Sequence, residues 1–197
     1  AGTLRRSGTG TASFNGVEFQ NDAGTLIDVT AGSLQLNTSG TLAGGTINAA
    51  PGASVILNGT NFATSGSFTG TGGGQVNLTS GTLTLGVGGA TVNFPAGYFN
   101  WSGSAIVENG TLTNNGFIQL VSGTPQLNDA TLDNAGTIIN SGARIDFAGT
   151  SVLNNLVGAT IDVTIAGASD FTANLGGINS VVHNAGTFQH SGAGILS

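Results

Sequence analysis

Apolar residues recur along the chain in short groups in which polar residues alternate with them. Two such groups are 34–36 (Leu-Gln-Leu) and 76–78 (Val-Asn-Leu). This alternation is typical of β-strands, because successive side chains of a strand point to opposite faces. No long window has the spacing of apolar residues that a helix requires. The pattern therefore predicts an all-β chain.

The groups repeat with a period of about 20 to 22 residues. In one series, Gly or a small residue and then usually Thr precede an apolar residue. Two further series of apolar residues fall within each period, so that one period holds three short strands. Stacked periods of this kind predict a parallel β-helix, or β-solenoid, of about nine coils. We expect the interior stack of the first coils to contain Leu26, Ile47, Phe68 and Val92.

The segments between the predicted strands are rich in Gly and Asn, which suit tight corners. Asn134 and Asn184 each begin the sequence Asn-Ala-Gly-Thr, and Asn21 precedes Gly24 in a similar segment. Asn residues at matching corners are expected to stack their side-chain amides into ladders. The repeat is less regular near 93–117 and 162–187, so we expect two irregular coils there. We interpret 1–197 as a single β-helix segment, taken from a longer repeat array.

Three segments of the chain resemble a known group of proteins. They are 134–138 (Asn-Ala-Gly-Thr-Ile), 184–188 (Asn-Ala-Gly-Thr-Phe) and the opening 1–11 (Ala-Gly-Thr-Leu-Arg-Arg-Ser-Gly-Thr-Gly-Thr). They resemble the repeats of filamentous-haemagglutinin-like and autotransporter-passenger-like bacterial adhesins. The resemblance implies a right-handed parallel β-helix that is secreted or exposed on a bacterial cell surface. It implies a non-enzymatic, structural and adhesive role, with a surface protein or glycan of another cell as the partner.

Composition excludes several other functions. The chain has 197 residues with a net charge of -6, three Lys and Arg residues in total and no Cys. With only three basic residues it has no surface that could neutralise several phosphates, so we expect no binding to nucleic acid. No apolar run approaches the roughly 20 residues that span a bilayer, so we expect no membrane insertion of this segment. Enzymes that depend on Cys or on several basic residues are also excluded.

Aromatic residues are the first candidate for ligand contact. Tyr98 and Trp101, the only Tyr and Trp of the chain, lie in the first irregular coil. Exposed aromatic rings stack on sugar rings or on apolar side chains of a partner protein. The alternative is that the aromatic residues of this coil fill an enlarged part of the core.

Charged residues are the second candidate. Arg144 and Asp146 are two residues apart, so that on a strand they share one face. Together with Asp162 and a sugar platform near Trp101, they form the basis of an alternative function. In this alternative the chain is a carbohydrate-binding or carbohydrate-active β-helix, like the polysaccharide lyases and hydrolases. The main interpretation of Arg144 and Asp146 is a solvated ion pair without a chemical role.

Two further hypotheses concern ions and ice. The sequence predicts no cofactor, and the alternative is single Ca²⁺ ions at corners near Asp22, Asp28 or Asp170. Regular Thr columns on flat β-helices resemble ice-binding solenoids, and this remote alternative requires an unbroken Thr face. The Thr residues that would form it are Thr25, Thr46, Thr91, Thr137, Thr160 and Thr187. The open ends of a β-helix also predict end-to-end self-association.

Overall fold

The fold is given by a computed structural model that describes residues 1–165, 171–173, 175–176 and 179–193. Within these residues all regular structure is β, as the alternation predicts. The strands are β1 (Thr3–Arg6), β2 (Thr11–Asn15), β3 (Phe19–Asn21), β4 (Thr25–Val29), β5 (Ser33–Asn37), β6 (Gly40–Leu42), β7 (Gly45–Ala49), β8 (Ser54–Leu57), β9 (Asn61–Thr69), β10 (Gln75–Leu78), β11 (Thr82–Asn93), β12 (Phe99–Gly103), β13 (Ile106–Asn114), β14 (Phe117–Gly123), β15 (Gln126–Asn134), β16 (Thr137–Asn140), β17 (Ile145–Ala148), β18 (Val152–Asn155), β19 (Thr160–Val163), β20 (Phe171–Thr172), β21 (Val181–Asn184) and β22 (Thr187–His190).

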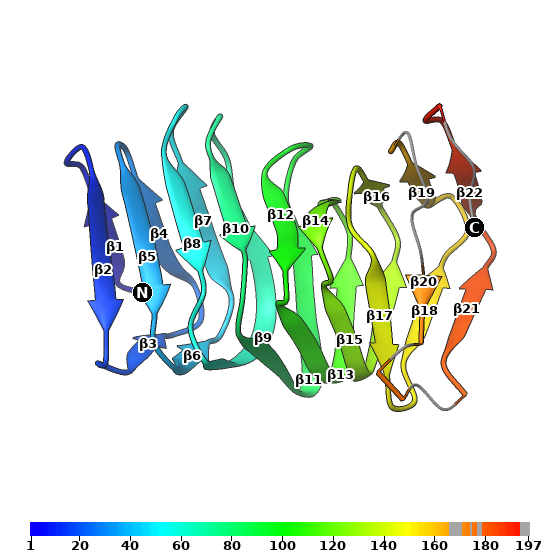
Figure 1. The fold of residues 1–197 in the computed structure, drawn as a ribbon. Coiled ribbons are helices and arrows are strands. Elements are labelled where there is room, and N and C mark those ends of the chain that lie inside the picture. Colours follow the sequence, from blue (N-terminus) through cyan, green and yellow to red (C-terminus); the bar gives the residue numbers. More distant parts are fainter. Residues whose placement is uncertain (166–170, 174, 177–178, 194–197) are drawn as a thin grey trace.

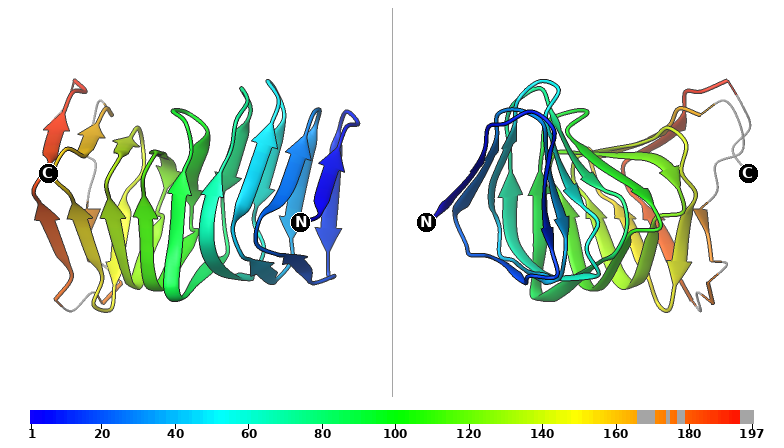
Figure 2. Two further views of the ribbon diagram at one scale, coloured as in Figure 1. Left: turned by 180° about the vertical axis from the view of Figure 1, so that it is seen from behind. Right: turned by 60° about the vertical axis from the view of Figure 1, so that its left-hand side comes forward.

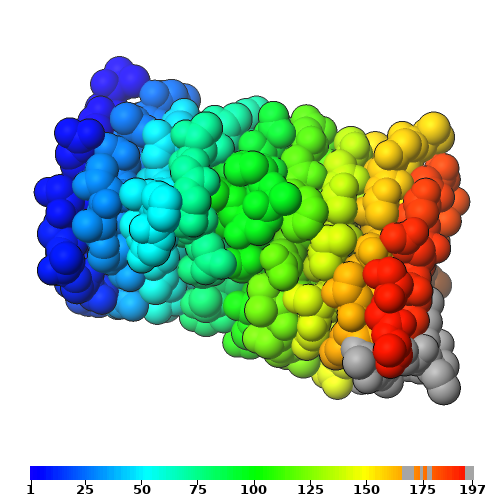
Figure 3. All heavy atoms as spheres, turned by 90° about the horizontal axis from the view of Figure 1, so that it is seen from above, coloured from blue at the N-terminus to red at the C-terminus, as the bar shows by residue number. Residues whose placement is uncertain are grey.

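The strands wind into a right-handed parallel β-helix, with β1 and β22 at opposite ends of the stack (Figure 1). A 9-stranded sheet runs in the order β2-β5-β8-β10-β12-β14-β16-β19-β22, and every pairing in it is parallel. Successive coils follow one another in sequence order when the molecule is viewed from behind and obliquely (Figure 2). From above they form successive bands (Figure 3). The described residues make about eight turns, slightly fewer than the nine coils expected.

The other 13 strands form a sheet that contains two ladders. One ladder comprises β1, β4 and β7, the second halves of β9, β11, β13 and β15, and then β18 and β21. The other comprises β3 and β6, the first halves of the same four strands, and then β17 and β20. Each turn therefore carries three short strand segments, which confirms the prediction of three per coil.

In each of the middle coils, a single long strand (β9, β11, β13 or β15) bends through the corner between these two ladders. Asn109 and Asp129 occupy this corner in consecutive coils, with φ of 56° and 47°, and Gly149 follows with φ of 59°. Positive φ is costly for most residues but is tolerated by Asn, Asp and Gly. The three residue types therefore serve the same bend.

The interior is apolar because alternate residues of each segment point inward. In β5, Leu34 and Leu36 are buried between partly exposed neighbours, as the alternation predicts. The predicted interior stack is wrong in two respects. Ile27 is buried and pairs with Ile47, whereas Leu26 is only half-buried. In addition, Phe68 pairs with Gly45 and not with Ile47. Ile47, Phe68 and Val92 are buried as expected.

The predicted Asn ladder is confirmed in the second half of the molecule. Asn114 donates from Nδ2 to Oδ1 of Asn134 (2.8 Å), Asn134 donates to Asn155 (2.9 Å), and Asn155 donates to Asn184 (2.7 Å). Each of the three donors also gives a hydrogen bond to a backbone carbonyl near the start of the next strand of the 9-stranded sheet. Asn114 and Asn134 are fully buried. The buried amides of Asn114, Asn134 and Asn155 each accept a hydrogen bond and donate two, so the ladder replaces apolar side chains without leaving these groups unpaired.

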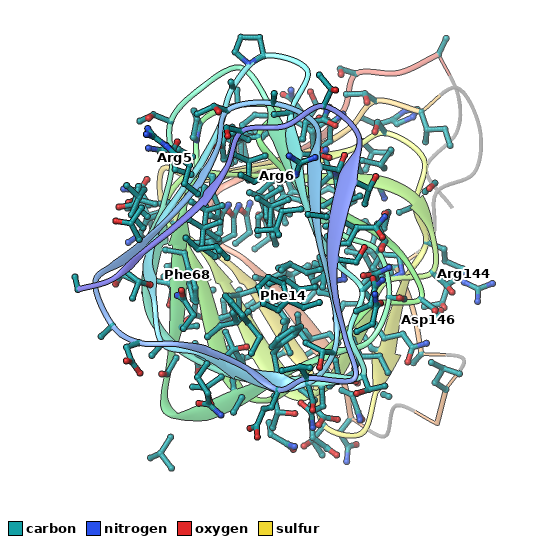
Figure 4. The ribbon with its side chains drawn as sticks, turned by 90° about the vertical axis from the view of Figure 1, so that its left-hand side faces the viewer. Arg5, Arg6, Phe14, Phe68, Arg144 and Asp146 are labelled. Carbon is teal, nitrogen blue, oxygen red and sulfur yellow. The ribbon has the colours of Figure 1, made fainter. Side chains whose placement is uncertain are left out.

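The first coil places a charged residue over the apolar core. Arg6 pairs with Val29, whose side chain is fully buried, so Arg6 occupies an inward position. Its Nη2 donates to the carbonyls of Thr9 and Gly10 at 3.0 and 3.2 Å. A view along the stack shows Arg6 and Phe14 inside the outline of the ribbon, whereas Arg5 lies at its edge (Figure 4).

Candidate functional site

The aromatic residues of the first irregular coil lie inside the solenoid. Tyr98 is 1% exposed and Trp101 is fully buried, so neither presents a ring to a ligand. The rings of Phe94 and Tyr98 stack with centroids 5.6 Å apart, and those of Phe94 and Phe99 with centroids 5.5 Å apart. The alternative in which these residues fill an enlarged part of the core is the one observed.

Polar atoms of the two buried aromatic residues are bound within the protein. Trp101 donates from Nε1 to the carbonyl of Ala105 at 3.0 Å. The hydroxyl of Tyr98 lies near two carbonyls, those of Ile47 at 2.8 Å and Thr71 at 3.0 Å, and accepts from the amide of Ala49 at 2.5 Å. Burial raises the pKa of Tyr98 because the phenolate would lose its hydration there. Tyr98 is therefore a neutral structural residue that joins distant turns.

Arg144 and Asp146 form the ion pair that their spacing predicts. Arg144 donates from Nε to Oδ1 of Asp146 at 3.0 Å and from Nη2 to Oδ2 at 2.8 Å. This is the two-point geometry that Arg and carboxylates favour. The expectation of a solvated pair is only half right. The Arg144 side chain is 39% exposed, but that of Asp146 is only 2% exposed. Figure 4 shows Arg144 pointing outward from the side of the solenoid, beside Asp146.

Asp146 is ionised and fully engaged by its neighbours. The hydroxyl of Thr172 in the next coil donates to its Oδ1. Burial by itself raises the pKa of Asp146, but the hydrogen bonds from Arg144 and Thr172 and the positive charge of Arg144 outweigh it. The net result is a pKa below the usual value of an Asp carboxyl. A general acid needs a raised pKa, so this environment is suited to holding a fixed charge.

Asp162 is held in a similar way on another sheet. Its carboxylate accepts from Nε2 of Gln189 at 2.9 Å and from the hydroxyl and amide of Ser191 at 2.9 and 3.1 Å. Burial opposes ionisation, yet these bonds lower the pKa of Asp162. Asp162 lies on β19 of the 9-stranded sheet, whereas Asp146 lies on β17 of the 13-stranded sheet. With Trp101 buried, the residues proposed for a sugar site do not meet in one groove.

The described residues contain no group of three or more His, Asp or Glu side chains that could hold a metal ion. Asp28 instead forms an ion pair with Arg5 at 2.8 Å. Asp22 is exposed at a turn. Asp170, the third residue considered for Ca²⁺, lies outside the described residues.

The six Thr residues considered for ice binding do not share one face. Thr137, Thr160 and Thr187 align with one another on β16, β19 and β22. The other three, Thr25, Thr46 and Thr91, lie on β4, β7 and β11 of the other sheet. In that sheet Thr46 pairs with Leu26 and Thr25 pairs with Gly45, so the column is interrupted. The prediction that these six Thr residues form a single column is therefore wrong.

A different surface feature was missed by the sequence analysis. The outward residues at the centre of the 9-stranded sheet form one continuous line, which we call the central polar column. It consists of Ser13, Gln35, Ile56, Asn77, Asn100, Gln119, Ile139, Asp162 and Gln189. Amides predominate, two members are Ile, and Asp162 is its one charged member. Asn100 and Asp162 are buried, whereas the other members are half-buried or exposed. Neighbours along it bond to one another, as in the 2.8 Å bond from Asn100 to Asn77. The polar residue between two inward apolar ones, as in 34–36, was the signal available for it.

In the part of the chain that the structure describes, no helix is long and apolar enough to cross a membrane. Comparisons with protein-family models, with curated proteins and with solved structures found no match for this chain.

Proposed function

We propose that this chain is a non-enzymatic, rigid segment of a secreted or surface-exposed protein, and that it contributes to attachment to another cell. The observation that carries the proposal is the use of its polar groups. The buried carboxylate of Asp146 and the buried amides of the Asn ladder are all bonded to residues of the same or a neighbouring coil. Such groups hold the stack together, so the chain's polar chemistry is directed to stability.

The central polar column is the surface that we propose for the contact. Its half-exposed amides, such as those of Gln35, Asn77 and Gln119, offer donors and acceptors on strands that lie about 4.8 Å apart from coil to coil. Groups of this kind form hydrogen bonds with the hydroxyls of a glycan or with the backbone of a protein. A nearly uncharged face also imposes little desolvation cost for ionised groups. The resemblance to bacterial adhesin repeats supports the same type of partner.

The proposal is tested by cell attachment. Beads that carry the full chain should attach to cells, and an excess of soluble chain should compete. The variant with Gln35→Lys and Gln119→Lys places two bulky charges in the central polar column and should reduce attachment at least about tenfold. The matched control, Thr46→Lys with Thr113→Lys, adds the same charge to outward positions of the other sheet and should attach like the unsubstituted chain.

Two results would contradict the proposal. One is an equal loss of attachment in both double variants, because this would indicate a general effect of charge. The other is release of sugar fragments from a panel of polysaccharides by the purified chain. In that case the carbohydrate-active alternative would replace the adhesive one.

A further inference from the structure

The interior of the solenoid contains a hollow in its N-terminal half. Side chains from four successive coils surround it, among them Leu57, Phe68, Val76, Ala90 and Phe99. Each of these five side chains is at most 5% exposed. The volume open to the centre of a water molecule is about 30 Å³. The void between the surfaces of the lining atoms is larger. Protein interiors rarely leave such a space empty.

The hollow has a structural cause in the irregular pairing of the coils around it. Phe68 of β9 pairs with Gly45 of β7. Because Gly45 has no side chain, β7 offers Phe68 no directly opposite neighbour. Strand β11 then contains extra residues between Leu85 and Ala90, where its register with β9 shifts. The rings of Phe94 and Phe99, which stack with an interplanar angle of 23°, also line the hollow. Packing around the hollow is therefore incomplete.

Water is a poor occupant of this space. Thr64 is the one lining residue with a polar side chain, and its hydroxyl already donates to the carbonyl of Phe62 at 3.0 Å. An ordered water molecule in a protein needs two to four polar partners, and apolar cavities of sufficient size stay dry. Dry cavities lined by Leu, Ile and Phe take up small apolar molecules or noble-gas atoms.

We propose that this hollow is a binding site for a small apolar ligand without hydrogen-bonding groups, of the size of a xenon atom. Binding restores the dispersion contacts that the lining side chains lack across the void. The Asn ladder, which begins at Asn114, contributes no side chain to the lining of the hollow. The site differs from the proposed cell contact, which uses outward side chains of the 9-stranded sheet.

The experiment is methyl NMR spectroscopy of the full chain under increasing xenon pressure. The methyl resonances of Leu57, Val76 and Ala90 should shift and saturate, while those of Leu132 and Ile138, which lie in later coils and do not line the hollow, should remain in place. Shifts of equal size throughout the core, or no shifts at all, would overturn the proposal.

A pair of matched variants locates the site. Ala90→Leu fills the hollow and should abolish the saturable shifts, whereas Ala63→Leu adds the same atoms at an exposed position of β9 and should leave them unchanged. Retained binding in a folded Ala90→Leu variant would contradict the assignment. If that variant does not fold, crystals of the unsubstituted chain under xenon decide the matter. Xenon density among the lining residues supports the site, and its absence there rejects it.

Discussion

The buried Asn ladder makes the most specific energetic prediction, for the substitution Asn134→Ala. Asn134 accepts a hydrogen bond from Asn114 and donates to Asn155 and to the carbonyl of Thr160, at 2.8, 2.9 and 3.0 Å. The substitution leaves the Asn114 donor without its Asn partner in the interior, and an orphaned buried donor costs about 1–3 kcal/mol. The two abandoned acceptors add roughly 1 kcal/mol each. We expect a total loss of about 3–5 kcal/mol in the free energy of unfolding.

Two control substitutions of the same residue type calibrate this value. Asn154→Ala removes an outward amide that donates to Asp133 at 2.7 Å, and should cost about 0.5–1 kcal/mol. Asn184→Ala removes the last member of the ladder, which is exposed and accepts one bond from Asn155, and should cost roughly 1 kcal/mol. The expected order is therefore Asn134 well above Asn184 and Asn154.

The assay is urea unfolding at pH 7, followed by fluorescence and by circular dichroism. Trp101 is the only Trp and is fully buried, so its emission reports on the centre of the stack. Agreement of the two probes is needed for a two-state free energy, because cooperativity can break down in repeat proteins. If Asn134→Ala and Asn154→Ala cost the same within about 0.5 kcal/mol, the reasoning about the buried ladder is refuted.

Three further predictions follow from single contacts. Tyr98→Phe removes a buried hydroxyl and leaves the amide that bonds to it unpaired, so urea unfolding should show a loss of about 1–3 kcal/mol; no loss would contradict the bonding. Asp146 has a lowered pKa and so adds stability above about pH 4, lost as the pH falls through its folded pKa. Asp146→Asn should therefore flatten the change in unfolding midpoint between pH 7 and pH 3, unlike the exposed Asp22→Asn, and equal profiles would contradict it. For this chain, Arg6→Leu should raise the concentration-dependent mass in light scattering more than Arg5→Leu, because only Arg6 occupies an inward position, where a charge disfavours pairing of β1 with a second copy; equal masses would contradict this role.

The sequence predicts the class of fold well because the fold repeats one local rule. Alternation within short segments and a fixed period are sufficient to predict three parallel strands per coil. Register is harder, since neighbouring apolar residues such as Leu26 and Ile27 satisfy the same pattern and only the stacking partner distinguishes them. The series of Gly-Thr-apolar segments also does not stay on one sheet. Val92 lies on β11 of the 13-stranded sheet, whereas Ile118, the next member, lies on β14 of the 9-stranded sheet, because the coil length changes between them.

The candidate site was predicted less well than the fold. Trp101 follows Asn100 in a segment that reads as a loop, and no local signal shows that this coil widens to enclose its rings. Arg144 and Asp146 were correctly placed on one face, because that depends only on the two-residue period of a strand. The hydrogen bond that Asp146 accepts from Thr172 could not be predicted from a local pattern, because Thr172 is distant in sequence and belongs to the next coil.

The register of the stack is the central claim, and disulfide trapping tests it most directly because the chain has no Cys of its own. Gln119 and Ile139 are outward partners on β14 and β16, one coil apart. Adjacent parallel strands lie about 4.8 Å apart, within the separation of about 4.4–6.8 Å that a disulfide spans between Cα atoms.

The variant with Gln119→Cys and Ile139→Cys should form an intramolecular disulfide on mild oxidation, detected by a mass loss of two hydrogen atoms. The control with Gln119→Cys and Asp162→Cys places the thiols two coils apart in the same column and should remain reduced. A disulfide in the first variant alone is the result we predict. No disulfide in the first variant, or equal oxidation of both, would contradict the stacking register.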